Sequence, residues 1–124
     1  MWTSIAAGAL AMAVMIGAFG AHALRDRLDA YSMGVYEKAV FYHFVHGLGL
    51  LVVSLLTRVG ALGASTATWV CTLLLAGIVL FSGSLYALAI SGVRALGAVT
   101  PLGGLCFIAA WLMLAYGAWK AARG

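Results

Sequence analysis

Charged side chains are scarce in this chain: they make up 8% of its 124 residues, while 65% of the residues are hydrophobic. A soluble domain usually carries about 25% charged residues, and a globule of this composition would lack the polar groups to cover its surface. Lipid is the solvent that tolerates it. A helix needs roughly 20 apolar residues to cross the hydrocarbon core, so the chain has room for four crossings and short connections, and none for an additional water-soluble catalytic domain.

Acidic residues are the rarest charges, and none falls within an apolar run, because Asp26, Asp29 and Glu37 all lie between residues 25 and 38. A proton-coupled multidrug pump of this size needs a carboxylate inside the membrane, so that mechanism has no residue here. Ser-His-Asp sets, Gly-rich phosphate loops and metalloprotease motifs are also absent. The sequence therefore predicts a protein that is not an enzyme and has no cofactor.

Neither the cysteines nor the basic residues indicate a metal, a redox partner or nucleic acid. Cys71 and Cys106 form no CxxC pattern, which leaves no zinc or redox motif. The seven Lys and Arg give a net charge of +4 but are scattered between the apolar runs, as is typical of helix ends that face water and lipid headgroups. Membrane lipids are the expected partners, and nucleic acid is not.

Four apolar segments are long enough to cross a membrane, at about residues 2–24, 39–56, 68–90 and 100–118. Each is expected to be helical, because backbone groups in lipid must find their hydrogen bonds within the segment. The predicted fold is an all-α membrane protein, a four-transmembrane-helix antiparallel bundle formed by a single domain over residues 1–124. The Lys and Arg counts on the two sides are too even to set its orientation.

The segment 25–38 is the only substantial polar stretch. Leu28, Tyr31 and Val35 recur in it at helical spacing. We expect a short interfacial helix between the first two spans, or an early start of the second span after an N-cap at Ser32. An irregular loop is the remaining alternative.

Small residues recur at fixed spacing in the spans. Residues 9, 13, 17 and 21 are all Ala or Gly, and such stripes allow two helix backbones to approach closely. They predict packing within the bundle or between two copies, with a substrate path as the other interpretation. The glycines expected at helix contacts are Gly17, Gly20, Gly83, Gly103 and Gly104.

Three histidines are the most informative polar residues of the spans. His22 ends the first span, while His43 and His46 begin the second on one helical face. They are expected in one leaflet, together with hydroxyl groups of the third and fourth spans. The predicted polar cluster consists of His22, His43, His46, Ser82, Ser84, Tyr86 and Thr100.

Such a cluster has several possible roles. Imidazole groups can hydrogen-bond neighbouring helices, bind a small molecule or lipid headgroup, ligate a metal, or relay protons. Interhelical hydrogen bonding is the favoured interpretation, followed by binding of a small molecule. The HxxH spacing by itself is a weak signal, so no metal site is predicted.

Four motifs occur in order along the chain: Gly-Ala-Phe-Gly-Ala-His-Ala-Leu at 17–24, Tyr-His-Phe-Val-His at 42–46, Phe-Ser-Gly-Ser-Leu-Tyr at 81–86 and Thr-Pro-Leu-Gly-Gly at 100–104. Together they resemble the domain of unknown function 423 family of small bacterial membrane proteins (UPF0382-type), which looks related to the eukaryotic transmembrane protein 256. The resemblance covers nearly the whole chain. It implies a four-helix fold in the bacterial inner membrane, with no activity, cofactor or catalytic residue to carry over. It also implies that Gln is at home at the position of His43.

Two functional hypotheses follow. The leading one is a non-enzymatic accessory or structural subunit that packs against itself, as a homo-oligomer, or against a larger membrane protein complex. The alternative is a module that binds or transports a lipid, quinone or other apolar small molecule through the predicted polar cluster.

Overall fold

The computed structural model describes all residues from Met1 to Gly124, and every regular element in it is a helix. Four rods are long and apolar enough to cross a membrane, Trp2–Leu24, Ala30–Arg58, Ala64–Ser91 and Arg94–Arg123. Their elements are α1 (Trp2–Phe19), the π-helical turn η1 (Gly20–Leu24), α2 (Ala30–Arg58), α3 (Ala64–Gly77), the π-helical turn η2 (Ile78–Ser82), α4 (Gly83–Ser91), the 3₁₀ turn η3 (Arg94–Ala98) and α5 (Thr100–Arg123). The predicted all-α fold with four spans is confirmed.

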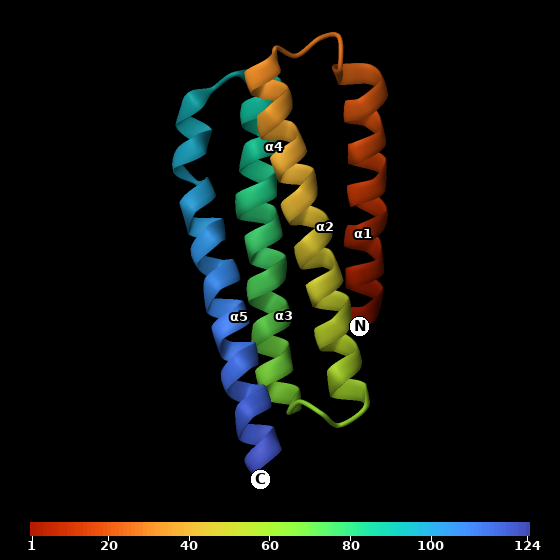
Figure 1. The fold of residues 1–124 in the computed structure, drawn as a ribbon, viewed down its shortest axis with the longest axis vertical. Coiled ribbons are helices and arrows are strands. Elements are labelled where there is room, and N and C mark those ends of the chain that lie inside the picture. The colour runs from red at the N-terminus through yellow and green to blue at the C-terminus, as the bar shows by residue number, and fades with distance from the viewer.

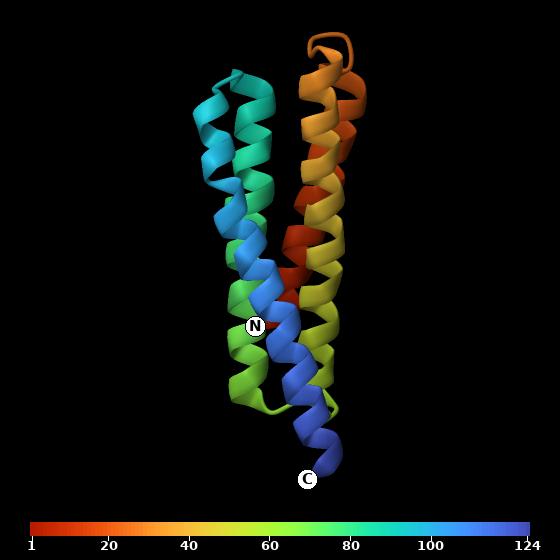
Figure 2. The same cartoon turned by 60° about the vertical axis from the view of Figure 1, so that its left-hand side comes forward.

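The rods run antiparallel, and both chain termini point toward the same end of the bundle (Figure 1). α1 packs mainly against α2, and α5 packs mainly against α3 and η2, so α2 and the α3–α4 rod are the inner helices. After a 60° turn, α5 is seen to cross obliquely over α3 toward the lower end (Figure 2). α1 thus occupies an outer position, with α2 as its main neighbour.

From Ala30 on, the polar segment before the second span is the start of α2 itself, and residues 25–29 form the turn that precedes it. Asp29 has extended backbone (φ −68°, ψ 169°), and its carboxylate accepts a hydrogen bond from the backbone N–H of Ser32 at 2.7 Å. The predicted separate interfacial helix is therefore wrong, and the alternative, an early start of span two, is found. The N-cap is Asp29 and not Ser32, because a side chain caps the free N–H three residues after it.

This cap gives a first testable prediction. The hydrogen bond from the Ser32 backbone N–H lowers the pKa of the Asp29 carboxyl below its ordinary value. Asp29→Ala is expected to fray the first turn of α2, seen as faster hydrogen–deuterium exchange of the amides of residues 31–33. Asp29→Asn keeps an accepting oxygen and is expected to exchange nearly as slowly as the wild type. Equal exchange in all three proteins would contradict the capping role.

Other span boundaries also lie outside the predicted apolar runs. The third rod begins at Ala64 and the fourth helix continues to Arg123, because helices continue past the hydrocarbon into polar surroundings and hydropathy marks only the apolar part. The rods end where the chain must reverse. Gly92 takes a left-handed conformation (φ +73°) after α4, a conformation that costs a glycine little.

The third rod departs from regular α-helix at η2. A π-helical turn widens the helix by one residue and is frequent at functional sites. Here the Ser82 hydroxyl at the end of the turn donates to the Ala39 carbonyl of α2 at 2.8 Å. Nothing in the residue pattern predicted this turn.

The main core lies where α2, the α3–α4 rod and α5 meet, around Leu50, Leu74 and Phe107. Two glycines allow α5 and its neighbours to come close. A Cβ at Gly103 would overlap the backbone of Phe81, and one at Gly77 would overlap the Phe107 ring.

The five glycines predicted to pack behave differently from one another. Gly20 lies directly against the Tyr36 ring, and at Gly17 an added Cβ would lie 3.4 Å from Val40. At Gly104 the nearest atom would be 3.9 Å away, an ordinary contact. Gly83 has nothing within 4 Å, so the prediction of a packing contact is wrong there. That empty space is part of a groove between α1 and the α3–α4 rod.

Candidate functional site

The structure does not gather the three histidines. His22 is exposed in η1 and lines no cavity, whereas His43 and His46 are buried in the middle of α2. At 1.5 Å of rise per residue, His43 lies about 7.5 Å and His46 about 12 Å along the helix from Lys38, the last charge before the uncharged part of α2. All three lie toward the same end of their spans, His22 near the end of Trp2–Leu24 and the other two in the half of the uncharged segment nearer Lys38. His22, however, lies at the surface of the bundle, apart from the two buried histidines.

The predicted hydroxyl residues mostly join helices to one another. The Ser84 and Thr100 side-chain oxygens are 2.7 Å apart and share a hydrogen bond between α4 and α5. Ser82 makes the bond to the Ala39 carbonyl described above. Interhelical hydrogen bonds of this kind contribute about 0.6 kcal/mol each on average. Ser82, Ser84 and Thr100 thus have partners within the bundle.

His46 is held in an aromatic stack. Its ring lies 3.4 Å from the Phe107 ring centroid at an interplanar angle of 10°. Its Nδ1 lies 2.7 Å from the Tyr42 carbonyl, and since a carbonyl only accepts, Nδ1 carries the proton there. His46 is therefore a packing residue between α2 and α5, about one helical turn after His43.

A groove opens between α1 and the α3–α4 rod, because α1 packs mainly on α2. Its volume is about 270 Å³. We call it the lateral groove, and the residues that line it are Ala9, Met12, Ile16, His43, Leu75, Ile78, Val79, Gly83 and Tyr86. All but His43 and Tyr86 are apolar or glycine, so the wall resembles lipid except at one point.

That point is the pair formed by His43 and Tyr86. The imidazole Nδ1 of His43 and the phenol oxygen of Tyr86 are 3.1 Å apart, and the two rings are 6.1 Å apart. The bond links α2 to α4 across one wall of the lateral groove. Because the pair lies within the apolar zone, no water competes for its remaining hydrogen-bonding capacity.

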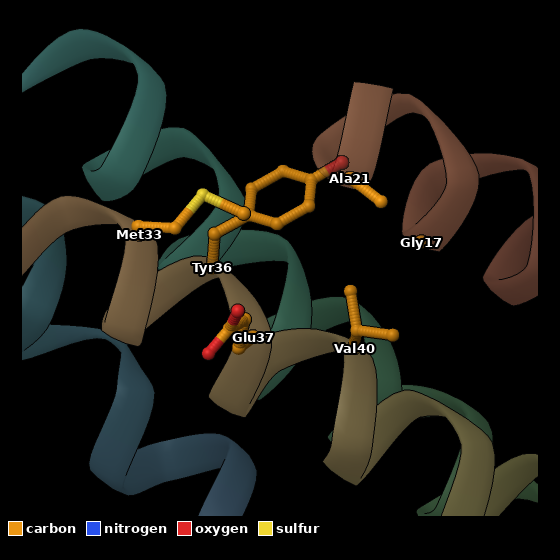
Figure 3. Close-up of a pocket in the computed structure, with 6 residues that line it drawn as sticks. All are labelled: Gly17, Ala21, Met33, Tyr36, Glu37 and Val40. Atoms are coloured by element: carbon orange, nitrogen blue, oxygen red, sulfur yellow. The ribbon is translucent and has the colours of Figure 1, made fainter. Parts of the chain in front are cut away.

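A second, smaller hollow lies between the end of the first rod and the first turns of α2 (Figure 3). Its volume is about 140 Å³, and its lining is Gly17, Ala21, Met33, Tyr36, Glu37 and Val40. The Tyr36 ring extends from α2 toward Ala21 (Figure 3), and its hydroxyl donates to the Ile16 carbonyl. Glu37 is exposed and next to Lys38 in sequence, at the boundary of the apolar zone. No group of three or more His, Cys, Asp or Glu side chains is placed to hold a metal ion.

The groove residues of α1 and α3 were not predicted. Met12, Leu75 and Val79 look in the sequence like any lipid-facing residue, because a groove wall and a lipid-facing surface have the same apolar composition. Only His43 and Tyr86 carried a signal.

Comparison with known proteins decides the family. A family model described as a protein of unknown function (DUF423) matches residues 16–104. The chain belongs to the DUF423 family. The resemblance predicted from its motifs is confirmed, and the matched residues include His43, Gly83 and Tyr86.

Several DUF423 relatives have similar length. A UPF0382 membrane protein of Staphylococcus epidermidis is 52% identical over 103 residues, 83% of this chain and 82% of the relative. One of Staphylococcus saprophyticus is 49% identical over 109 residues, 88% of each chain. The UPF0382 membrane protein YwdK of Bacillus subtilis is 46% identical over 111 residues, again 88% of each chain. No solved structure matches.

The relatives' names and the four apolar rods agree that this DUF423 chain is a membrane protein. The family description carries no catalytic activity and no ligand. What the protein does must therefore be argued from its own geometry.

Proposed function

We propose that this protein binds an apolar membrane molecule in the lateral groove, in the inner (cytoplasmic) membrane of a bacterium, and that it is not an enzyme. The observation that carries the proposal is the His43–Tyr86 pair, set in the wall of an otherwise apolar groove. The bacterial origin of its relatives supports the location.

Polar side chains within a membrane are costly and usually mark functional sites. In this bundle several of them bond to other helices, as Ser82 does to the Ala39 carbonyl. His43 and Tyr86 differ because the cavity that they line is otherwise apolar. A mainly apolar cavity with a few convergent polar groups is the usual form of a small-molecule site.

The chemistry of the groove supports binding without a reaction. Its lining contains no carboxylate, serine or cysteine that would act as an acid or a nucleophile. A His–Tyr pair can transfer protons, but with no nucleophile or carboxylate beside it the pair is suited to orienting a ligand through hydrogen bonds.

The other hypothesis, an accessory subunit, depended on small-residue stripes that would pack against a partner. In the structure the stripe of α1 is used within the chain: Ala9 and Ala13 are buried, and Gly17 faces Val40 of α2. Most of that stripe is therefore used for contacts within the chain, although other small residues of α1, such as Ala7, Ala11 and Ala18, are exposed. Docking to a homo-oligomer or a larger complex is the reading that remains if the groove binds nothing.

Methionine methyl groups provide a direct test, because Met12 lines the groove and Met113 lies on α5 against the core. Protein labelled with ¹³C-methyl methionine in detergent micelles would be titrated with methyl decyl ketone, an apolar chain with one carbonyl. We expect a saturable shift of the Met12 signal and an unchanged Met113 signal. A Met12 signal that never moves, or moves without saturation and together with Met113, would reject the groove as a binding site.

A further inference from the structure

We infer that the ligand of the lateral groove is a neutral molecule whose carbonyl oxygen accepts a hydrogen bond from the His43–Tyr86 pair. This inference rests on the proposed function and names the class of molecule that the groove selects. Charged amphiphiles, such as fatty acids and phospholipid headgroups, are excluded from it. Three properties of the molecule point to this class: the charge of the groove, its depth, and the hydrogen-bonding capacity of the pair.

The first property is charge. None of the nine residues that line the groove is Lys, Arg, Asp or Glu. An ionised carboxylate or phosphate placed there would lose its hydration and find no permanent counter-charge, which is strongly unfavourable in a low-dielectric medium. The groove therefore selects a neutral ligand.

The second property is depth. His43 lies about 7.5 Å along α2 from Lys38, inside the uncharged segment that ends at Arg58. A molecule whose headgroup stays in the interface would present only its hydrocarbon tail to the pair. The polar group that reaches His43 and Tyr86 must therefore belong to a molecule that enters the hydrocarbon as a whole.

The third property is the hydrogen-bond count of the pair. If His43 Nδ1 carries the proton, it donates to the Tyr86 oxygen, and the Tyr86 O–H stays free. If Nε2 carries the proton, the Tyr86 O–H donates to Nδ1, and the Ala9 backbone carbonyl of α1 lies beside the imidazole as a partner for Nε2–H. The bond between Nδ1 and the phenol oxygen is the one side-chain hydrogen bond of good geometry that the pair makes. The donor left at the groove is the Tyr86 O–H in the first tautomer and a weakly partnered Nε2–H in the second, and a ligand satisfies either with an accepting oxygen.

The size of the groove fits a chain ligand and not a large ring system. Its 270 Å³ corresponds to roughly nine water molecules at about 30 Å³ each. Gly83 adds to this space because no side chain occupies its position. Part of a single alkyl chain with its carbonyl group fills such a volume.

Three probes with chains of similar length separate the possibilities: methyl decyl ketone, dodecane and dodecanoate. Their affinities would be compared through the Met12 methyl signal at pH 8, where dodecanoate is ionised in solution. We expect the ketone to bind about fivefold more tightly than dodecane, the gain from one net hydrogen bond. Dodecanoate is expected to bind more weakly than the ketone by at least as much.

The double variant His43→Leu/Tyr86→Phe removes the donor in both tautomers. Replacing both partners of a buried hydrogen bond by apolar groups is nearly neutral for stability, so the bundle is expected to fold. The variant should bind ketone and dodecane with equal affinity. Ser84→Ala is the matched control, because Ser84 belongs to the same polar region but lies outside the groove. It should keep the fivefold preference.

The outcomes separate this inference from the proposed function. If no probe shifts Met12, the groove is not a binding site and the proposed function fails. If dodecane binds as well as the ketone to the wild type, the groove binds apolar molecules but the inferred ligand class is wrong. Tighter binding of dodecanoate, or a ketone preference that survives the double variant, would also overturn the inferred class.

Discussion

Gly103→Ala is expected to destabilise the bundle strongly. A Cβ at this position would overlap the backbone nitrogen and Cα of Phe81, and backbone atoms cannot move aside as a flexible side chain can. α5 would have to separate from η2, with loss of the contacts around Phe107. Overpacking of this kind costs about 1–3 kcal/mol, occasionally more. A lower thermal unfolding midpoint in a fixed detergent would measure it.

Gly104→Ala is the matched control, since it makes the same substitution one residue further along the same helix. Its Cβ would lie 3.9 Å from the Phe81 ring, which is ordinary contact. Alanine favours helix over glycine by about 1 kcal/mol, so this variant should be as stable as the wild type or slightly more stable. Equal destabilisation by the two substitutions would show that the close approach at Gly103 is unimportant.

Gly83→Leu is expected to abolish ligand binding and leave the fold intact. Gly83 lines the lateral groove, and nothing lies within 4 Å of the position of an added Cβ. A leucine side chain would occupy the space that a ligand needs, close to Tyr86 on the same helix. Titration with methyl decyl ketone should no longer shift the Met12 signal, while the unfolding midpoint should not fall.

Gly8→Leu controls for the added bulk and apolar surface. Gly8 lies exposed on α1, also has nothing within 4 Å, and does not line the groove. Its binding curve should match that of the wild type. If Gly83→Leu and Gly8→Leu weaken binding equally, the ligand is not in the lateral groove but in the detergent or lipid around the helices.

These expectations depend on an unusual feature of the bundle, the outer position of α1. A closed four-helix bundle would bury the face of α1 that carries Met12 and Ile16 against α3. Here α1 leans mainly on α2 through small residues, and the His43–Tyr86 pair borders the space that remains. Residues of α1 line both the lateral groove and the smaller hollow beside Glu37 (Figure 3).

The sequence by itself determined the solvent, the number of spans and the family. Scarcity of charge and four apolar runs dictate a membrane-spanning helical fold, because lipid tolerates no unpaired backbone groups. The ordered motifs around His22, His46, Gly83 and Gly103 were enough to indicate the DUF423 family. The polar residues worth examining were also visible, because any polar group in an apolar span stands out.

Only the tertiary structure decided which of those residues line the groove, which pack within the bundle and which lie at the surface. Sequence spacing placed His22, His43 and His46 together, but the structure leaves His22 exposed in η1 and buries the other two in α2, one against Tyr86 and the other against Phe107. Gly83 and Gly103 occur in similar small-residue motifs, yet one faces empty space and the other a backbone. In lipid, hydrophobicity does not distinguish a residue that faces the membrane from one that lines a groove. That distinction comes only from which helices meet, and here it comes from the outer position of α1.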